Sequence, residues 1–570
     1  MSMPRRIITK KNKLFDFAVH RVLLLLIIAL GAVLLLKNLG NHCLWQDEAE
    51  TALVGKTILT HGIPIGTDGK NSFSQDMAGD ERKYDPWRLH PWLQFYVVAL
   101  SFALFGADTF SARLPFALIG IGVIFLTYIF TRDLFKNRWI ALIAAGLIAT
   151  SVPFLLLSRQ SRYYSLLIFL ALLTTWIYTR FMQRGKFTLP VFIISASLCF
   201  HTFYPGFMVL ILALSAHALL FHRSELKLLG RALVWIGFIN FPWFLWFRAY
   251  PGVRRQLYSP MHIIQQLSDF VKIISVHVFS PWLFLMALLV ALMLFFSPKW
   301  KRKIFKHNSL TSPQSAAADK ECARYRIQLP SWKAPFFLLI IIISAYPVFF
   351  SIPAHTFFRY LGPIIPFLCI LTALIVYGAF QAHPFLGICA LALVIWMQPL
   401  NDFVYEITHD YLGPIKGISS YLNKNGKMED TVLITYDDLP LKFYTGMRIM
   451  GGYTGEDLKS ARKAEWIIIR KYVNSPYEWP IRRYIKENIS FSNYKKIVLN
   501  CPDLPYENRE CPCHHHFRTV LNEDRVIIYK RISQLNPFAL QCRTPSASPP
   551  GLAASFWKPV ISATKPDNDK

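Results

Sequence analysis

Long apolar runs constrain this chain more than any other feature of its sequence. A helix needs about 20 mostly apolar residues to cross the hydrocarbon core of a bilayer, and the chain contains about eleven runs near that length. The predicted spans lie near residues 17–38, 112–131, 139–157, 165–181, 188–203, 206–221, 231–248, 279–297, 335–351, 361–379 and 384–399. Of the 570 residues, 53% are hydrophobic and 17% are charged. This composition is typical of a polytopic α-helical membrane protein.

Basic residues between the apolar runs predict how the chain is oriented. The formal charge is +28. Five basic clusters fall on one side of the predicted membrane, which the positive-inside rule assigns to the cytoplasm: MSMPRRIITKKNK, RDLFKNR, RFMQRGK, FHRSELKLLGR and SPKWKRKIFK. RAYPGVRR (248–255) is the exception, because it falls on the outer side. An anionic membrane surface, and not nucleic acid, is therefore the expected partner of the positive charge.

One apolar segment does not fit the pattern of spans. HPWLQFYVVALSFALFG (90–106) is too short to cross the membrane comfortably, and counting it as a span would move RDLFKNR to the outer side. We therefore expect an interfacial helix on the outer surface. The first run, Phe15–Leu36, is too long for the core of a signal peptide and is interpreted as an uncleaved span. The N-terminus is then cytoplasmic and the C-terminal part lies outside.

After about residue 400 the chain changes to short β-rich segments separated by polar stretches. Predicted strands lie at 431–436, 465–473, 495–500 and 525–532. ITYDDLPLKFYTG (434–446) is expected to form a strand and a turn of the same domain. The chain is thus expected to comprise a transmembrane domain (1–400), a small outer α/β domain (401–535) and a disordered tail (536–570). Residues 300–333 are expected to form a flexible cytoplasmic loop.

Ionisable and aromatic residues gather on the outer face of this topology. They are Asp47, Glu48, His90, Arg159, Arg162, Tyr163, His201, Tyr204, His355 and Arg359. Such groups are costly at membrane depth, so a cluster of them indicates a functional site. Each also has a structural interpretation. Asp47 followed by Glu50 is typical of a capping box, His201 suits an interfacial histidine, and single arginines at span ends commonly anchor to lipid head groups.

The cluster suits group transfer from a phosphorylated lipid. A carboxylate beside a hydroxyl acceptor can take its proton as the hydroxyl attacks. Arginines can neutralise a departing phosphate through charge-assisted hydrogen bonds. Carboxylates together with a histidine can also hold a divalent cation.

Five stretches of the chain resemble integral-membrane glycosyltransferases of the GT-C class, and specifically the bacterial protein O-mannosyltransferase and aminoarabinose-transferase-like family. The stretches are WQDEAETALVGKTILTHGIPIGTDG, HPWLQFYVVALSFALFGADTFSARLPFALIGIGVIFLTYIFTRDLF, SRQSRYYSLLIFLALL, CFHTFYPG and FFRYLGPIIPFL. The resemblance implies a GT-C fold in a bacterial inner (plasma) membrane. It also implies an inverting transferase that moves a sugar from a polyprenyl-phosphate donor to an envelope glycolipid, polysaccharide or protein on the outer face.

The resemblance also implies roles for individual residues. The catalytic acid of the first outer loop maps onto Asp47, with Glu48 beside it, and the arginine of the RY…P…P segment, a candidate for the donor phosphate, maps onto Arg359 with Tyr360. The predicted site has two further groups of residues. The donor phosphate or lipid is expected to contact His355, Arg159 and Arg162. The substrate is expected to contact His90, Tyr163, His201 and Tyr204. Many relatives carry a further aspartate in the second outer loop, where this chain reads SRQSRYYSL. Because that carboxylate is missing, metal ligands are not assigned and a divalent cation stays an open alternative.

CPDLPYENRECPCHHHFRTV (501–520) contains cysteines and histidines whose spacing does not suit a single zinc site. Consecutive histidines cannot all face one ion, and C-x-C differs from the usual ligand spacing. A disulfide, for example involving Cys501, is an equal alternative.

Two rival functions remain open on the sequence. A transporter or lipid flippase would also have many spans, although such proteins commonly show paired repeats and broken helices at mid-membrane. A relative that binds lipid without catalysis is the other alternative.

Overall fold

The computed structural model describes residues 5–73, 86–248, 259–296, 333–352, 357–452, 458–471, 478–505 and 507–532. Several predictions fall outside these residues. They concern the cytoplasmic loop (except its last residue, Lys333), RAYPGVRR beyond Arg248, the site residue His355 and the tail from residue 536.

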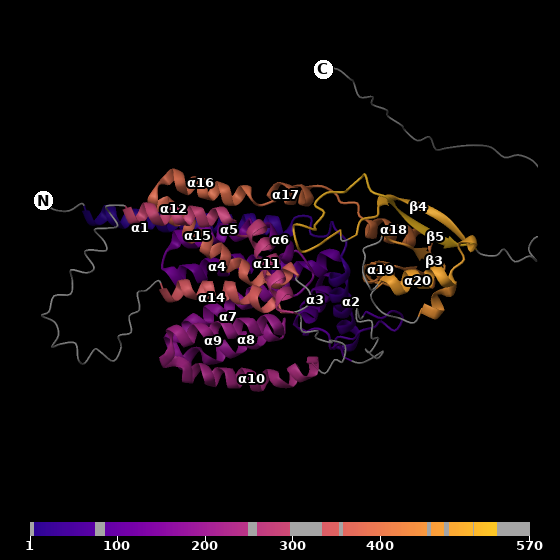
Figure 1. The fold of residues 1–570 in the computed structure, drawn as a ribbon, viewed down its shortest axis with the longest axis horizontal. Helices are drawn as coiled ribbons and strands as arrows, with labels where there is room; N and C mark the ends of the chain where they lie inside the picture. The colour runs from indigo at the N-terminus through magenta and orange to yellow at the C-terminus, as the bar shows by residue number, and fades with distance from the viewer. Residues whose placement is uncertain are drawn as a thin grey trace, which may run out of the picture.

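Most of the chain forms a bundle of long helices, and a smaller α/β part lies at one end of it (Figure 1). The bundle comprises α1 (Arg5–Leu36), α4 (Thr109–Phe135), α5 (Arg138–Ala149), α6 (Val152–Ser158), α7 (Tyr164–Arg184), η1 (Gly185–Thr188), α8 (Leu189–Phe200), α9 (Tyr204–Phe221), η2 (Arg223–Glu225), α10 (Leu226–Arg248), α11 (Pro260–His277), α12 (Pro281–Phe296), α14 (Lys333–Phe350), η5 (Phe358–Ile364), α15 (Ile365–Ala382), α16 (Pro384–Trp396) and α17 (Leu400–Thr408). In the described part of the chain, 7 helices are long and apolar enough to cross a membrane, or up to 10 spans if each bent pair counts as one.

Three candidate spans of the structure are bent pairs of helices, and of these only α5 with α6 matches a single predicted span, 139–157. α5 with α6 bends by 64°, α11 with α12 by 69° and α16 with α17 by 51°. Each second helix begins beside a proline, namely Pro153, Pro281 or Pro399. A proline ring clashes with the preceding turn of a helix, which explains why the helices break there. The predicted span at 188–203 corresponds to α8, which has only 12 residues.

The segment between α1 and α4 contains two helices, α2 (Gln46–His61) and α3 (Leu93–Phe105). The side chains of Tyr96, Leu100 and Leu104 on α3 are exposed and lie four residues apart, so they form one apolar stripe. Such a stripe is typical of a helix that faces lipid.

The expected capping role of Asp47 is wrong. Helix α2 begins one residue earlier, at Gln46, and its N-cap is Trp45. Glu48 takes the capping role at the third position, because its Oε2 accepts a hydrogen bond of 3.4 Å from the Trp45 N–H. The Asp47 side chain is therefore not used by the helix start.

The α/β part contains a five-stranded sheet in the order β2-β1-β3-β5-β4. Its elements are α18 (Pro414–Asn425), β1 (Thr431–Ile434), α19 (Asp438–Thr445), β2 (Arg448–Gly451), η6 (Leu458–Lys463), β3 (Trp466–Ile468), α20 (Glu478–Asn488), η7 (Phe491–Asn493), β4 (Tyr494–Pro502) and β5 (Arg525–Arg531). Strands β1, β2 and β3 pair in parallel, whereas β5 pairs antiparallel with β3 and β4. Ile418 of α18 and Leu441 of α19 pack on one face, and Ile481 of α20 packs on the other.

The four predicted strands correspond to β1, β3, β4 and β5, but the prediction for residues 434–446 is wrong. Only Ile434 belongs to a strand there, and residues Asp438–Thr445 form helix α19. This helix is held against the segment that contains α2 and α3. Leu439 is buried in the core shared with α2 and α3, and Gln46 donates a hydrogen bond of 2.8 Å to Asp438. The α/β part is thus attached directly beside the start of α2.

Candidate functional site

The first five residues of α2 include three carboxylates, and each of them pairs with a different arginine. Asp47 contacts Arg359, which lies in η5. Glu48 contacts Arg113, which lies in α4. Glu50 contacts Arg162, which lies in the loop before α7. Segments far apart in the sequence therefore meet at one short helix end.

Asp47 and Arg359 form the pair that remains open to solvent. Arg359 Nη1 lies 2.6 Å from Asp47 Oδ2, and the two side chains are 13% and 14% exposed. The same Nη1 lies 3.4 Å from the Tyr164 hydroxyl and 3.8 Å from Glu510 Oε1. The other two carboxylate–arginine pairs are almost fully buried. Of the three pairs, Asp47 and Arg359 therefore form the one that a substrate can reach.

The charge around Asp47 keeps its carboxylate ionised. Burial raises the pKa of Asp47, but Arg359, then Arg162 and Arg509, lower it by a larger total, so the pKa lies below its ordinary value of 3.8. An ionised carboxylate at neutral pH is able to accept a proton.

Glu48 is held by several donors at once. Its side chain is 0% exposed. Arg113 donates to both of its oxygens, at 2.8 Å from Nε and 2.6 Å from Nη2. The Ser161 N–H at 2.7 Å and the Asn508 side chain at 3.1 Å donate as well. These contacts favour a positioning role for Glu48, because it joins α2, α4, the loop before α7 and the C-terminal part.

Glu50 and Arg162 are buried and form a second cluster with His90, which is partly exposed. Arg162 Nη1 lies 2.7 Å from Glu50 Oε1, and Nη2 donates to His90 Nε2 at 3.1 Å. The same Nη1 donates to the Asp47 backbone carbonyl at 3.1 Å. Arg162 therefore fixes the backbone that carries Asp47, and His90 lies one contact away from it.

An aromatic stack lies beside Arg359. Tyr163 stacks on Phe203 with ring centroids 4.7 Å apart. Phe203 stacks on Tyr360 at 5.7 Å, and Tyr360 on Phe350 at 4.8 Å. Two of the predicted site residues, Tyr163 and Tyr360, are thus joined through a residue that the sequence did not single out. Within the stack, the rings of Phe203 and Tyr360 are partly exposed, and the centre of the Tyr360 ring lies 5.9 Å from the Arg359 guanidinium.

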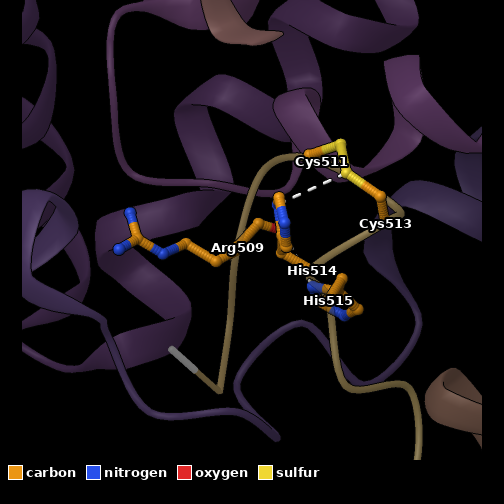
Figure 2. The surroundings of a disulfide bond; sticks show 5 residues. All are labelled: Arg509, Cys511, Cys513, His514 and His515. Atoms are coloured by element: carbon orange, nitrogen blue, oxygen red, sulfur yellow. Dashed lines mark hydrogen bonds between the residues drawn. A yellow bond between two sulfur atoms is a disulfide. The ribbon is translucent and has the colours of Figure 1, made fainter. Parts of the chain in front are cut away.

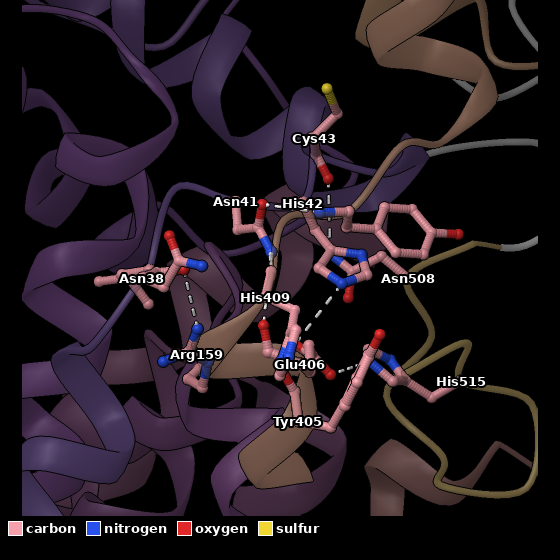
Figure 3. A network of polar contacts seen from close by, with 12 residues as sticks. Asn38, Asn41, His42, Cys43, Arg159, Tyr405, Glu406, His409, Asn508 and His515 are labelled. Atoms are coloured by element: carbon pink, nitrogen blue, oxygen red, sulfur yellow. Dashed lines mark hydrogen bonds and ion pairs between the residues drawn. The ribbon is translucent and has the colours of Figure 1, made fainter. Parts of the chain in front are cut away.

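Three predicted site residues make contacts elsewhere. Arg159 donates to the backbone carbonyls of Leu34, Leu35, Lys37 and Asn38 at the end of α1 (Figure 3). His201 packs edge-on against Trp243, and Tyr204 stacks with Phe247. The contacts of Arg159 suit helix capping, because a positive charge is favoured at the C-terminal, negative end of a helix dipole. A further predicted site residue, His355, lies outside the described residues.

Sequence reasoning missed several residues of the site. Arg113 carried a recognisable signal, because an arginine inside an apolar span needs a partner. Asn508, Arg509 and Glu510 carried none, because each lies far along the chain from the residue that it contacts: Asn508 from Glu48, Arg509 from Trp45 and Glu510 from Arg359. The Arg509 guanidinium lies 4.8 Å from the centre of the Trp45 ring.

The cysteine- and histidine-rich segment also has a defined structure. Cys511 and Cys513 form a disulfide, while Cys501 is a free buried thiol, so the alternative that involved Cys501 is wrong (Figure 2). His514 is exposed and lies 3.3 Å from the Cys513 sulfur, whereas His515 is buried. Within the described residues, two groups have metal-ligand spacing: His277 with Cys511 and Cys513, and His42 with Glu406 and His515. Asp47 belongs to neither group.

Similarities to known proteins cover both the sequence and the fold. Residues 89–246 match the family described as dolichyl-phosphate-mannose-protein mannosyltransferase. A stretch of 96 residues is 29% identical to a Bacillus subtilis (strain 168) protein named "Putative mannosyltransferase YkcB". That stretch covers 17% of this chain and only 13% of the relative.

Two solved structures have a similar fold over most of the chain. ArnT from Cupriavidus metallidurans bound to undecaprenyl phosphate matches with a TM-score of 0.52 at 14% identity, over 90% of this chain and 99% of that one. The archaeal oligosaccharyltransferase AglB from Archaeoglobus fulgidus, in complex with an inhibitory peptide and a dolichol-phosphate, matches with a TM-score of 0.52 at 13% identity, over 86% and 74%. The predicted fold class is thereby confirmed: this is a multi-pass membrane protein with the GT-C fold and a C-terminal α/β region.

Proposed function

We propose that this protein is an inverting glycosyltransferase that moves a sugar from a polyprenyl-phosphate donor to a cell-envelope acceptor on the outer face of the membrane. The observation that carries the proposal is the Asp47–Arg359 pair of 2.6 Å. It places one ionised carboxylate and one guanidinium together at a partly open position, with an aromatic surface beside them.

The two groups supply complementary parts of such a transfer. An acceptor hydroxyl oxygen attacks the anomeric carbon, and Asp47 takes the hydroxyl proton. The bond between that carbon and the phosphate oxygen breaks, and the polyprenyl phosphate leaves with the electron pair. Arg359 releases Asp47 and binds the phosphate oxygens, whose developing negative charge a guanidinium stabilises well. Arg359 thus supplies charge that a divalent cation would otherwise supply.

The remaining residues of the cluster fit supporting roles. Arg162 and Glu48 fix the start of α2, so that Asp47 needs little reorganisation before the reaction. The stack of Tyr163, Phe203 and Tyr360 offers an apolar surface for the first isoprene units or for the face of the sugar. His90 lies beside Arg162 and is positioned to contact a substrate hydroxyl or phosphate.

The solved structures with this fold support the choice of donor. ArnT was solved with undecaprenyl phosphate and AglB with a dolichol-phosphate. The ligand class shared by these two proteins is a polyprenyl phosphate, and we extend that class to this chain. AglB was also solved with an inhibitory peptide. The proposal leaves the acceptor as a glycolipid, a glycan or a protein.

The proposal is tested with purified full-length protein in detergent and an extract of envelope lipids. Radiolabelled polyprenyl-phosphate sugars are added, and release of free polyprenyl phosphate is followed. Release that depends on both the protein and an acceptor is the expected result. Binding of the donor without release would contradict the proposal and favour a lipid-binding protein. Movement of intact donor across vesicles would favour a flippase.

Replacement of Arg359 is expected to weaken catalysis strongly. Arg359→Gln should lower kcat/KM for the donor by about 10²–10³, the usual effect of removing one group that stabilises developing charge. The kcat/KM of Arg359→Lys should lie between those of the wild type and Arg359→Gln, because lysine keeps the positive charge but not the planar guanidinium. Arg518→Gln is the matched control, since Arg518 is exposed and pairs with Asp402. A change below about threefold in Arg359→Gln would exclude the phosphate role.

The pH dependence of transfer is expected to reflect the lowered pKa of Asp47. Because the base must be ionised, kcat/KM should fall only below about pH 4, where the carboxylate becomes protonated. In Arg359→Gln the acid limb should move to higher pH, because the largest charge that lowers the pKa is gone. Rates measured from pH 3 to pH 8, with melting temperatures at each pH, check this. An acid limb above about pH 5 in the wild type would assign it to another group.

A further inference from the structure

A second polar cluster lies away from the Asp47–Arg359 pair. It comprises His42, in the loop after α1, Glu406, on α17, and His515, in the C-terminal part (Figure 3). One ligand atom from each lies within 4.8 Å of the others, and all three side chains are buried. Three segments that are distant in the sequence thus direct two imidazoles and one carboxylate toward a common point.

Two side chains at this point have unused hydrogen-bonding groups. Neither ring nitrogen of His42 has a hydrogen-bond partner among the described residues, although the side chain is only 4% exposed. Gln160 is 2% exposed, and both polar atoms of its amide lack partners in the same part of the structure. Leaving a buried polar group unpaired costs about 1–3 kcal/mol, so several of them in one place need an explanation.

These residues line one small cavity. It has a volume of about 10 Å³, and its walls include His42, Gln160, Glu406 and His515. That is about the room that one water molecule or one ion needs. The side chains of His42 and Gln160, whose polar atoms lack partners, therefore line the same cavity.

The contacts of His515 resemble those of a metal-bound histidine. Its Nδ1 lies 2.8 Å from the Arg509 carbonyl oxygen, so Nδ1 carries a proton and donates it. Metal-bound histidines commonly use their second nitrogen in this way. The other nitrogen, Nε2, then faces Glu406 Oε2 at 2.7 Å. If the His515 ring were neutral, the lone pair of Nε2 would face the Glu406 carboxylate and repel it. A bound cation between them, or a proton on Nε2, removes this repulsion.

The distances also suit a cation. With bonds of about 2.0–2.1 Å in a tetrahedral site, ligand atoms lie about 3.3–3.5 Å apart. His42 Nε2 is 3.7 Å from Glu406 Oε1, and His515 Nε2 is 2.7 Å from Oε2. The two distances, which involve different oxygens of Glu406, lie on either side of the expected separation, so a cation between Glu406 and His515 would require these two side chains to move slightly apart.

We propose that His42, Glu406 and His515 bind one divalent cation of the zinc class, with the Gln160 amide oxygen or a water as the fourth ligand. Two imidazoles and one carboxylate form a donor set that Zn²⁺ prefers over Mg²⁺ or Ca²⁺. Arg113 and Arg159 also line the cavity, but their charges are used elsewhere. Arg113 pairs with Glu48 at 2.6 Å, and Arg159 donates to carbonyls at the negative end of α1.

The site would fasten the C-terminal segment to the membrane part. Just before His515, Asn508 contacts Glu48 and Glu510 approaches Arg359. A cation shared by α17, the loop after α1 and His515 would hold that segment over the Asp47–Arg359 pair. Its ligands do not contact the reacting groups, so the cation is a positioning element, and its presence does not depend on the proposed transferase activity.

Metal content tests the proposal directly. Full-length protein, purified in detergent through a tag without histidines, is loaded with Zn²⁺, freed of excess and measured by mass spectrometry of the elements. About one zinc per chain is expected. His42→Gln and Glu406→Gln should lose most of it, whereas His514→Gln and the double variant Cys511→Ser/Cys513→Ser should keep it. Loss confined to the cysteine variant, or no bound zinc in the wild type, would overturn the proposal.

A measurement on unaltered protein guards against variants that fail to fold. Removal of metal from the wild type by a chelator should lower the melting temperature, and Zn²⁺ but not Mg²⁺ should restore it. Co²⁺ in place of Zn²⁺ should give the visible absorption of a four-coordinate site. A melting temperature unchanged by chelation, together with no cobalt signal, would leave a metal-free Glu406–His515 ion pair as the correct interpretation.

Discussion

Asp47→Asn should reduce sugar transfer by at least about a hundredfold, and by up to about 10⁴, while leaving donor binding nearly unchanged. Loss of a positioned general base commonly has this effect. The asparagine keeps the size of the side chain and can still accept a hydrogen bond from Arg359, which lies 2.6 Å from the native carboxylate. It cannot take a proton from the acceptor. Single-turnover release of polyprenyl phosphate, measured beside equilibrium binding of the donor, separates the two effects.

The matched control is Asp269→Asn. Asp269 is a 40% exposed aspartate that pairs with Lys272 on α11, far in sequence from the site. It should retain full activity. If Asp47→Asn were as active as this control, the transfer would need another base, and Glu510, 3.8 Å from Arg359, would be the next group to replace. If donor binding disappeared together with turnover, Asp47 would instead hold the substrate.

The sequence was informative where chemistry and local pattern coincide. Asp47 and Arg359 lie 312 residues apart, and both were selected because ionisable residues at span ends are costly without a purpose. The structure brings them together at 2.6 Å. The strand positions were also predictable, because short runs of β-branched residues bounded by polar segments have few other interpretations.

The partners of the other two carboxylates were not predictable from local sequence. Glu50 was considered only as part of a possible capping box with Asp47, yet it holds Arg162 at 2.7 Å. A capping pattern and an ion-pair partner look alike in sequence, because both need only an acid in the first turn. In helix α19, Leu439, Leu441 and Phe443 alternate with other residues, which is a pattern typical of a strand. In the structure, Leu439 packs against α2 and α3. Tertiary packing overrides such short patterns.

Breaking the buried pair of Glu48 and Arg113 is expected to have a large effect on the stability of the protein. Arg113→Gln should lower the free energy of unfolding by about 3–5 kcal/mol, because it leaves a buried carboxylate without its counter-charge. Glu48 is fully buried. The Ser161 N–H and the Asn508 amide would remain as donors, but neither carries charge. Scanning fluorimetry in detergent should show a drop of several degrees in melting temperature, with faster cleavage near residue 508 by added protease.

Arg132→Gln, also on α4, is the control that shows how much of the stability loss in Arg113→Gln comes from the burial of Arg113. Arg132 is 45% exposed beside Asp133, so its replacement should change stability by less than about 0.5 kcal/mol. The double variant Arg113→Gln/Glu48→Gln should recover part of the loss, since two neutral amides can hydrogen-bond to each other and no charge stays buried. If Arg113→Gln melted like Arg132→Gln, Glu48 would have to be protonated or otherwise compensated in the native state. The positioning role assigned to it would then fail, because an acid that tolerates the loss of Arg113 does not fix the start of α2.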